Sequence, residues 1–234
     1  MRLDKLFSDL GLLSRRDCAR SVKLGEITVD GVPASRADMK VDENTAVIHF
    51  RGERIAFSKF VYVMLNKPRG YISATTDGRA PVVTELLPAE LQRRGLFPCG
   101  RLDKDTTGFM LLTDDGQTAH RLLSPRHHVE KVYAFTLDAP LPTGAEARFL
   151  SGVRLGDEVC KPAGLLLTEG RREGTIMLTE GKYHQIKRMM LGEGCTVVTL
   201  NRVSFGGVPL DGSLAPGEWR YLTAAETELL LSQK

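Results

Sequence analysis

The loop at residues 100–108 reads Gly-Arg-Leu-Asp-Lys-Asp-Thr-Thr-Gly and runs directly into the apolar segment Phe109–Leu112. The loop is polar and rich in turn-forming residues, whereas the segment after it has the composition of a buried strand. Loops that place an acid at the mouth of a sheet often carry catalytic residues, so Asp103 is a candidate for that role. In an ordinary solvated loop the same Asp and Thr side chains bond their own backbone, and the residues alone leave both interpretations open.

Strands and helices are interspersed along the chain on both sides of this loop. No regular strand–helix–strand order is visible, which favours an α+β fold over a doubly wound parallel sheet. Apolar β-rich runs predict strands over 60–65, 71–74, 109–113, 131–137, 165–168, 175–179 and 196–200. Helical spacing and capping residues predict helices over 115–123, 144–150, 183–193 and 224–231.

The first quarter of the chain predicts a separate small module. Apolar residues recur at helical spacing over 3–10, and Ser14 is a natural N-cap for a second helix that stops at Gly25. Asp30-Gly31 between two short apolar runs predicts a hairpin. We expect one domain at residues 1–57 and a second at 58–234, with a linker over 51–60.

Basic side chains are concentrated in the first 23 residues, which hold six basic groups against three acids. Lys and Arg that project from one side of a small module suit an RNA backbone. They would also fit a solvated helical face, and the charge pattern leaves both interpretations open. The six residues are Arg2, Lys5, Arg15, Arg16, Arg20 and Lys23.

Composition bounds the class of protein. The 234 residues are 42% hydrophobic and 26% charged, as in ordinary globular proteins, and no apolar run approaches the roughly 20 residues that cross a bilayer. The first residues lack an apolar signal core, and the four cysteines lie far apart without a C-x-x-C pair. These features predict a cytoplasmic protein without a disulfide framework or a structural zinc site. The net charge of +3 permits a polyanionic partner without proving one.

The sequence also bears on three other site chemistries. The chain has no G-x-x-x-x-G-K-[ST] sequence, which excludes a P-loop. His127 and His128 are adjacent, so both rings do not readily face one metal ion from a helix, and we expect no metal site. A phosphotransferase or metal-dependent phosphohydrolase built around Asp103-Lys104-Asp105 stays open as an alternative.

Four ordered motifs resemble those of the pseudouridine synthases and span nearly all of residues 60–222. The loop at 100–108 resembles the catalytic motif of that family. The other three stretches are Leu65–Tyr71, Glu130–Tyr133 and Glu180–Met189. The arrangement is similar to the RsuA branch of the family, within which Ser124–His128 and Asp105–Gly108 look closest to the enzyme that modifies small-subunit ribosomal RNA.

The beginning of the chain resembles an S4 domain, a small (αL-like) RNA-binding module. The resemblance rests on Arg2–Leu6, Ser14–Asp17 and Gly25–Gly31. It implies an S4 domain followed by a catalytic domain with a mixed, mainly antiparallel sheet.

The resemblance also implies a reaction. A pseudouridine synthase breaks the bond between ribose C1′ and uracil N1, turns the base, and joins C1′ to C5, so neither a cofactor nor a metal is required. Asp103 is the implied carboxylate, acting by attack on C1′ or by removal of a proton from C2′. Lys187, where many members carry Arg, is the implied cation beside it, and Tyr133 the aromatic against the uracil face.

The implied substrate is one uridine in small-subunit ribosomal RNA, met as RNA or as a ribosomal subunit assembly intermediate by a monomeric enzyme without membrane contact. A large-subunit relative and a non-catalytic RNA-binding or assembly factor are the alternatives. Further RNA contacts are expected from Arg101, Arg126, Lys131 and Arg188, besides the six basic residues near the start.

Overall fold

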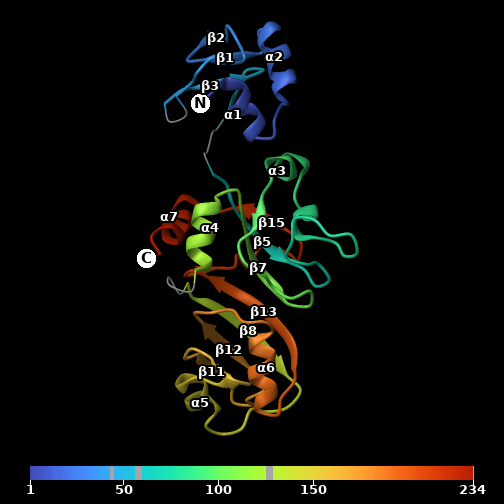
Figure 1. Ribbon diagram of the computed structural model, residues 1–234, viewed down its shortest axis with the longest axis vertical. Helices are drawn as coiled ribbons and strands as arrows, with labels where there is room; N and C mark the ends of the chain where they lie inside the picture. Colours follow the sequence, from blue (N-terminus) through green and yellow to red (C-terminus); the bar gives the residue numbers. More distant parts are fainter. Residues whose placement is uncertain (43–44, 56–59, 125–128, 234) are drawn as a thin grey trace. The chain divides into compact units, whose positions relative to one another are not determined.

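The computed structural model describes residues 1–42, 45–55, 60–124 and 129–233, which form two compact units (Figure 1). The first unit contains Met1–Val61 and Leu87–Leu96, and the second contains Tyr62–Leu86 and Phe97–Lys234. The expected boundary between residues 57 and 58 lies outside the described residues. Within the described ranges, no helix combines the length and apolar character needed to cross a membrane.

The first unit packs two short helices against a four-stranded antiparallel sheet. Ser14 Oγ accepts a hydrogen bond from Asp17 N at 3.1 Å, which confirms the predicted N-cap. Asp30 and Gly31 have φ of +52° and +81°, as the predicted hairpin requires. The helices are α1 (Leu3–Asp9) and α2 (Arg15–Lys23), and the sheet has the order β2 (Val32–Pro33), β1 (Ile27–Val29), β3 (Ile48–Phe50) and β4 (Glu53–Ile55). The sheet thus includes Glu53–Ile55, a segment that the sequence assigns to the linker.

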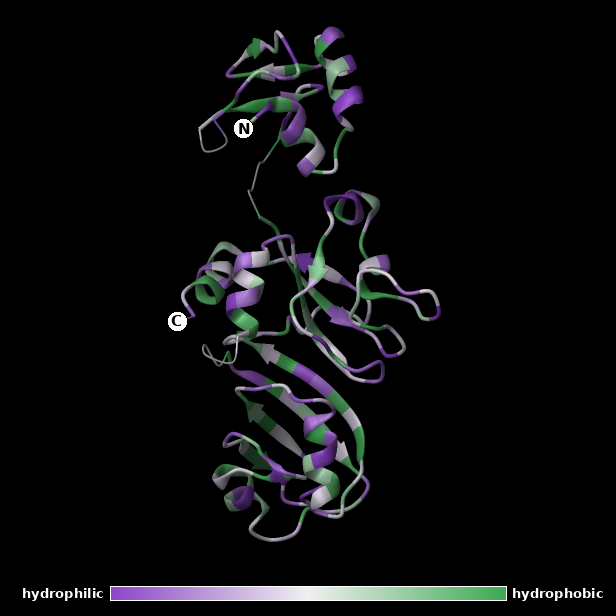
Figure 2. Ribbon diagram, in the orientation of Figure 1, coloured by the Kyte–Doolittle hydropathy of each residue, from purple (hydrophilic) through white to green (hydrophobic). Residues whose placement is uncertain are grey.

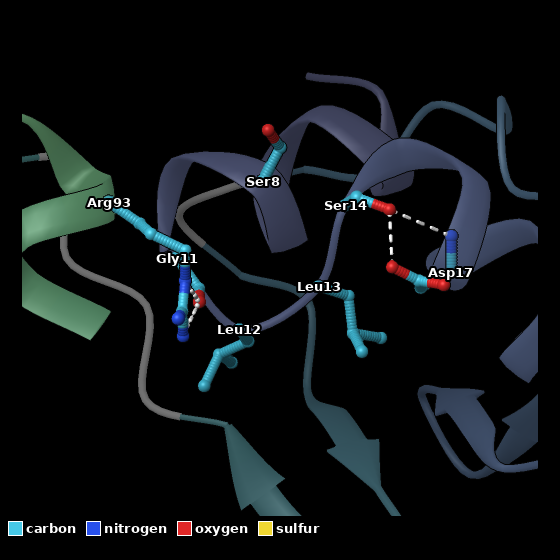
Figure 3. A pocket seen from close by; sticks show the side chains of 7 residues that line it. All are labelled: Ser8, Gly11, Leu12, Leu13, Ser14, Asp17 and Arg93. Carbon is cyan, nitrogen blue, oxygen red and sulfur yellow. Dashed lines mark hydrogen bonds between the residues drawn. The ribbon is translucent and has the colours of Figure 1, made fainter. Parts of the chain in front are cut away.

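A third helix belongs to the first unit although it lies far along the chain. The sequence gives no sign of α3 (Ala89–Arg94), which is one and a half turns long. Arg93 donates two hydrogen bonds to Gly11 O, at 3.0 and 2.9 Å. Gly11 has φ of +68°, and a Cβ there would lie 2.3 Å from Glu90 O, so this close approach requires glycine. Figure 3 shows the shallow pocket that results, lined by Ser8, Gly11, Leu12, Leu13, Ser14, Asp17 and Arg93.

The second unit is built on one nine-stranded, mainly antiparallel sheet, which confirms the expected fold class (Figure 1). Only β13 and β7 pair in parallel in the described part of this sheet. Its order is β11 (Gly164–Leu167), β12 (Glu173–Leu178), β8 (Lys131–Leu137), β13 (Val197–Phe205), β7 (Thr107–Thr113), β5 (Tyr62–Lys67) and β15 (Trp219–Tyr221). The short β6 (Phe97–Pro98) pairs with β7, β14 (Val208–Pro209) pairs with β13, and β9 (Arg154–Leu155) forms a separate hairpin with β10 (Glu158–Val159).

Helices pack against this sheet at two places along its strand order. Leu122 on α4 (Gly116–Leu123) and Leu230 on α7 (Ala224–Leu231) join Phe109 and Phe205 in one buried cluster. Further along the sheet, α5 (Ala145–Ser151) lies against β11, and α6 (Gln185–Gly192) lies against β9 and β13. Hydrophobic and hydrophilic residues follow one another along β13, as expected for a strand with two different faces (Figure 2).

Most predicted elements of this unit are confirmed, and one is wrong. The strand expected at 131–137 is β8, and Asp115 and Thr223 cap α4 and α7. The strand expected at 71–74 does not form, since Ile72 makes only an isolated bridge to Val82. The reason is tertiary, because Ser73 Oγ bonds the loop that carries Asp103. The sequence also does not predict η1 (Val83–Leu86) or the edge strand β15.

Candidate active site

Asp103 lies in the loop between β6 and β7, and backbone contacts fix that loop from two sides. Ser73 Oγ donates to Leu102 O and accepts from Leu102 N, both at 2.9 Å. Gly70 N donates to Lys104 O at 2.8 Å, and Thr106 N donates to Asp103 O at 3.1 Å. The segments around 70–73 and 100–106 therefore hold one another, and the Asp103 carboxylate is presented from a preorganised turn.

Lys67 at the end of β5 anchors the same loop from inside. Its side chain is completely buried, and Nζ donates to Thr106 O at 2.7 Å, Pro68 O at 3.2 Å and Lys104 O at 3.4 Å. Burial lowers the pKa of Lys67 to about 8, although attraction to Asp105 and Asp103 opposes that shift. The ammonium is therefore the main form at neutral pH.

We expect Lys67→Met to lower kcat about 100-fold while leaving Asp103 in the chain, because a displacement of about 1 Å in a reacting group can cost that much. Single-turnover rates at a saturating concentration of substrate measure the effect, and Lys104→Met, an exposed lysine of the same loop, is the matched control. In the unfolded chain Lys67 has the ordinary lysine pKa near 10.4. Burial of its charge therefore lowers the stability of the folded protein most below pH 8, and this loss of stability disappears as the pH rises from about 8 to about 10. Equal rates in the two variants would show that the buried lysine does not position the loop.

The cation from α6 reaches the candidate acid. Lys187 Nζ lies 3.1 Å from Asp103 Oδ2 and 2.6 Å from Asp105 Oδ1. The Lys187 and Asp103 side chains are 25% and 30% exposed, so this ion pair is partly screened by solvent. Burial disfavours the charge on Lys187, yet its bonds to Asp105 and Asp103 outweigh that and raise its pKa. Burial likewise opposes the charge on Asp105, but the hydrogen bond and the charge of Lys187, with smaller help from a backbone hydrogen bond and from Arg69, together outweigh burial and lower the pKa of Asp105.

His184 completes the group around Asp103. Its Nε2 lies 3.5 Å from Asp103 Oδ1, and its backbone has φ of +46°, a left-handed conformation that is uncommon for a residue with a side chain. The turn before it is braced by the buried Gln185, whose Oε1 accepts from Lys182 N at 2.9 Å and whose Nε2 donates to Glu180 at 2.5 Å. Gln185 therefore serves as a brace for this turn.

Tyr133 is tied to this loop through the sheet. Gly108 pairs with Arg202 on β13, and Arg202 pairs with Tyr133 on β8. Two strand spacings, about 10 Å, therefore separate the backbone of Tyr133 from that of Gly108, with β13 between them. A Cβ at Gly108 would lie 2.1 Å from Asn201 Oδ1, so glycine lets β7 approach β13 this closely. The Tyr133 side chain is 8% exposed.

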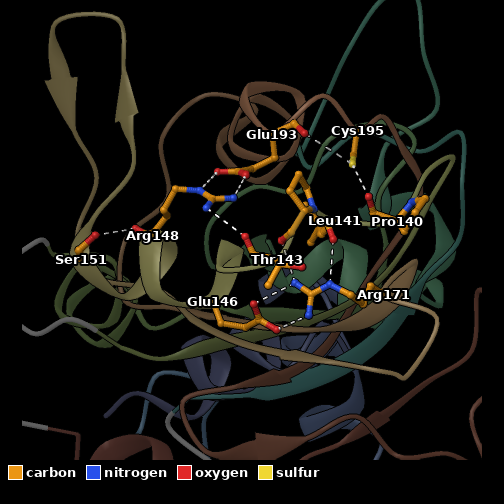
Figure 4. Close-up of polar contacts among 10 residues, drawn as sticks. Pro140, Leu141, Thr143, Glu146, Arg148, Ser151, Arg171, Glu193 and Cys195 are labelled. Carbon is orange, nitrogen blue, oxygen red and sulfur yellow. Dashed lines mark hydrogen bonds and ion pairs between the residues drawn. The ribbon is translucent and has the colours of Figure 1, made fainter.

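The far end of α6 is fastened by ion pairs (Figure 4). Arg148 on α5 makes a two-pronged contact with Glu193, which follows the last residue of α6. Arg171 pairs with Glu146 at 2.7 Å and donates to Leu141 O at 2.8 Å. These contacts join α5, the β11–β12 turn and α6, and so they help to fix the helix that carries Lys187.

The residues expected to bind RNA differ in how exposed they are. Arg101 is exposed, and Arg188 is half-buried one residue after Lys187. Arg126 lies outside the described residues. Lys131 Nζ donates to Val129 O at 2.7 Å and lies 5.7 Å from the centre of the Phe205 ring, so its ammonium turns inward. Burial lowers the pKa of Lys131 to about 8, and its expected contact with RNA stays a prediction.

The six basic residues within the first 23 positions divide into two sets. Arg2 pairs with Asp4 at 2.7 Å, and Lys5 pairs with Asp9 at 2.6 Å. The other four are exposed on α2, where three of them recur at helical spacing on the side away from the buried Cys18 and Val22. These three are Arg16, Arg20 and Lys23, and Arg15 is the fourth.

Sequence reasoning missed two contributors. Lys67 was available in principle, since it shares a strand face with Val63 and Leu65 and is therefore a lysine at an apolar position. The sequence does not indicate that Asp105 is a second carboxylate bound to Lys187, because the two residues are 82 positions apart.

Fold and site together define an RNA-modifying enzyme, and the chain belongs to the RNA pseudouridylate synthase family, whose model matches residues 61–191. The model of the S4 domain matches residues 1–47. The protein is thus an enzyme that isomerises uridine to pseudouridine, which decides against the phosphotransferase and the non-catalytic factor.

Individual relatives cover almost the whole chain. It is 44% identical to the uncharacterized RNA pseudouridine synthase YtzG of Bacillus subtilis, over 98% of each chain. It is 41% identical to the ribosomal small subunit pseudouridine synthase A of Escherichia coli, over 97% of this chain and 98% of the relative. A solved pseudouridylate synthase structure superimposes with a TM-score of 0.69 at 36% identity, over 98% of this chain and 99% of the other.

Proposed function

We propose that this enzyme isomerises one specific uridine of small-subunit ribosomal RNA, with Asp103 as the acting carboxylate. The observation that carries the assignment of Asp103 is the lysine ammonium 3.1 Å from its carboxylate, on a loop held by Lys67 and Ser73. The choice of RNA is supported by relatives named for the small subunit at 41–42% identity over 97% of this chain.

Each group has a part in the reaction. The target nucleotide leaves its stack at a cost of a few kcal/mol, and its base lies against Tyr133. The ionised Asp103 attacks C1′ or takes the C2′ proton while the bond from C1′ to N1 breaks. The base turns, C1′ joins C5, and the C5 proton is lost to solvent as a proton returns to N1. Atoms and electrons balance without any redox step.

The S4 domain supplies a second, weaker contact with the RNA. Two linked weak contacts bind much more tightly than either alone. In this proposal the protein acts in the cytoplasm as a monomer, on ribosomal RNA or on an assembling subunit, and the exposed stripe Arg16, Arg20 and Lys23 meets phosphates of the folded RNA.

Mapping pseudouridine across both ribosomal RNAs, in cells with and without this gene, tests the proposal. We expect one site in the small-subunit RNA to be lost, and to return with the wild-type gene but not with Asp103→Asn. A lost site in the large-subunit RNA would overturn the choice of substrate. Unchanged maps would overturn the proposed function.

Removing the stripe of charge on α2 should weaken RNA binding in a salt-dependent way. Replacing Arg16, Arg20 and Lys23 together with Gln should make the slope of log K against log salt shallower by roughly 3, at close to one unit per lost phosphate contact. Filter binding at several salt concentrations measures the slope. Arg36→Gln is the matched control, because that arginine is exposed in the same unit but pairs with Asp38 at 2.9 Å. A slope as steep as the wild-type slope would place the RNA elsewhere.

A further inference from the structure

An exposed pair of stacked rings lies beside the proposed catalytic carboxylate and has no part in the reaction described above. The rings of Tyr183 and His184 have centroids 3.9 Å apart and an interplanar angle of 16°. Tyr183 is 78% exposed, the largest fraction among the exposed large hydrophobic side chains of the described residues. The face of its ring that does not meet His184 is therefore open to a ligand.

The stack depends on an uncommon backbone conformation at His184. Side chains of consecutive residues diverge in both helices and strands, so neighbouring rings do not normally lie face to face. His184, at φ +46° and ψ +36°, is left-handed, which brings its ring onto that of Tyr183. A non-glycine residue in this region costs of order 1 kcal/mol or more and is concentrated at functional sites.

The stack is also held in place. Gln185 fixes the turn at Lys182 N and at Glu180, and Glu180 accepts from Lys161 N at 3.0 Å. Arg188 Nη1 lies 3.5 Å from Tyr183 O. A rigid aromatic surface loses little entropy when a flat ligand stacks on it.

The position of the stack indicates what it binds. His184 Nε2 is 3.5 Å from Asp103 Oδ1, so the two rings begin where the target ribose must lie. The nucleotides on either side of a flipped-out uridine stay attached within one backbone repeat, and their bases have lost a stacking neighbour. Every base has a flat π-face that stacks on an aromatic ring without regard to sequence.

We propose that Tyr183 and His184 form a stacking platform for the nucleobase next to the target uridine, while Tyr133 serves the target itself. This inference rests on the proposed function, because it takes an RNA strand with its uridine at Asp103 as the ligand. The platform replaces the stacking that the neighbour loses, and so lowers the cost of opening the RNA.

Fluorescence of 2-aminopurine tests the platform directly. The probe is a small-subunit ribosomal RNA fragment that contains the mapped uridine, with 2-aminopurine on its 5′ side or its 3′ side. Binding to full-length Asp103→Asn, which does not turn the RNA over, should quench one of the two positions. Tyr183→Leu in that background should remove the quenching and raise Kd roughly tenfold, whereas Tyr183→Phe should retain both.

A kinetic measurement separates stacking from a merely structural role. In the otherwise wild-type enzyme, Tyr183→Leu should raise KM and leave the single-turnover rate at saturating RNA unchanged. Tyr221→Leu is the matched control, since Tyr221 is 53% exposed in the same unit and packs edge-on against Trp219. It should change neither value.

The outcomes are distinguishable. Quenching that survives Tyr183→Leu, an equal loss in Tyr183→Phe, or quenching at neither position would overturn the platform while leaving the proposed function intact. A fall in the saturating rate without a change in KM would also overturn it. Failure of Asp103→Asn to bind the fragment would overturn the proposed function and this inference with it.

Discussion

Asp103→Asn should abolish formation of pseudouridine, with a rate at least about 1,000-fold below that of the wild type, because an amide neither attacks C1′ nor accepts the C2′ proton effectively. RNA affinity should stay close to wild type, since the replacement is nearly isosteric and the phosphate contacts lie elsewhere. Chromatography of the digested RNA measures the product, and filter binding measures the affinity.

Asp105→Asn is the matched control for that experiment. It removes a carboxylate that bonds the same ammonium at 2.6 Å, two residues further along the same loop. We expect this variant to keep most of its activity, because Lys187 still faces Asp103 at 3.1 Å. If Asp103→Asn still made pseudouridine, or if Asp105→Asn were as inactive as Asp103→Asn, the acting carboxylate would have been misassigned.

Lys187→Met should lower kcat about 100-fold, the usual effect of removing one preorganised charged partner from a reacting group. It leaves two neighbouring carboxylates without their shared cation, and it removes the charge that lowers the pKa of Asp105. A cation favours the ionised form of a carboxylate, so its loss should raise the pKa of Asp105 toward its ordinary value. An NMR titration of Asp105 and the saturating rate are the measurements.

Lys187→Arg is the conservative partner of that variant. A guanidinium keeps the charge but presents a planar fork in place of a compact ammonium. We therefore expect partial activity. A methionine variant as active as the wild type would show that Lys187 does not assist Asp103.

Local sequence was sufficient to predict many of the helix caps, turns and strands of this protein. The caps at Ser14 and Thr223, the Asp30-Gly31 turn and the strand at 131–137 depend on backbone preferences within a few residues, and they are confirmed. Asp103 was accessible as a candidate for the same reason, because a polar loop before an apolar strand is a local pattern. The order and spacing of the motifs indicated the pseudouridine synthase family, and the family model confirms this over residues 61–191.

Only the tertiary structure decided which groups meet. Asp103 and Lys187 lie 84 positions apart in the sequence, and the packing of α6 against the sheet sets their 3.1 Å separation. Packing also turned Lys131 inward, bound Ser73 to the Asp103 loop in place of a strand, and laid His184 on Tyr183. Short-range preferences fix an element and its ends, whereas the direction of a long side chain depends on which distant surface buries its stem or pairs its charge.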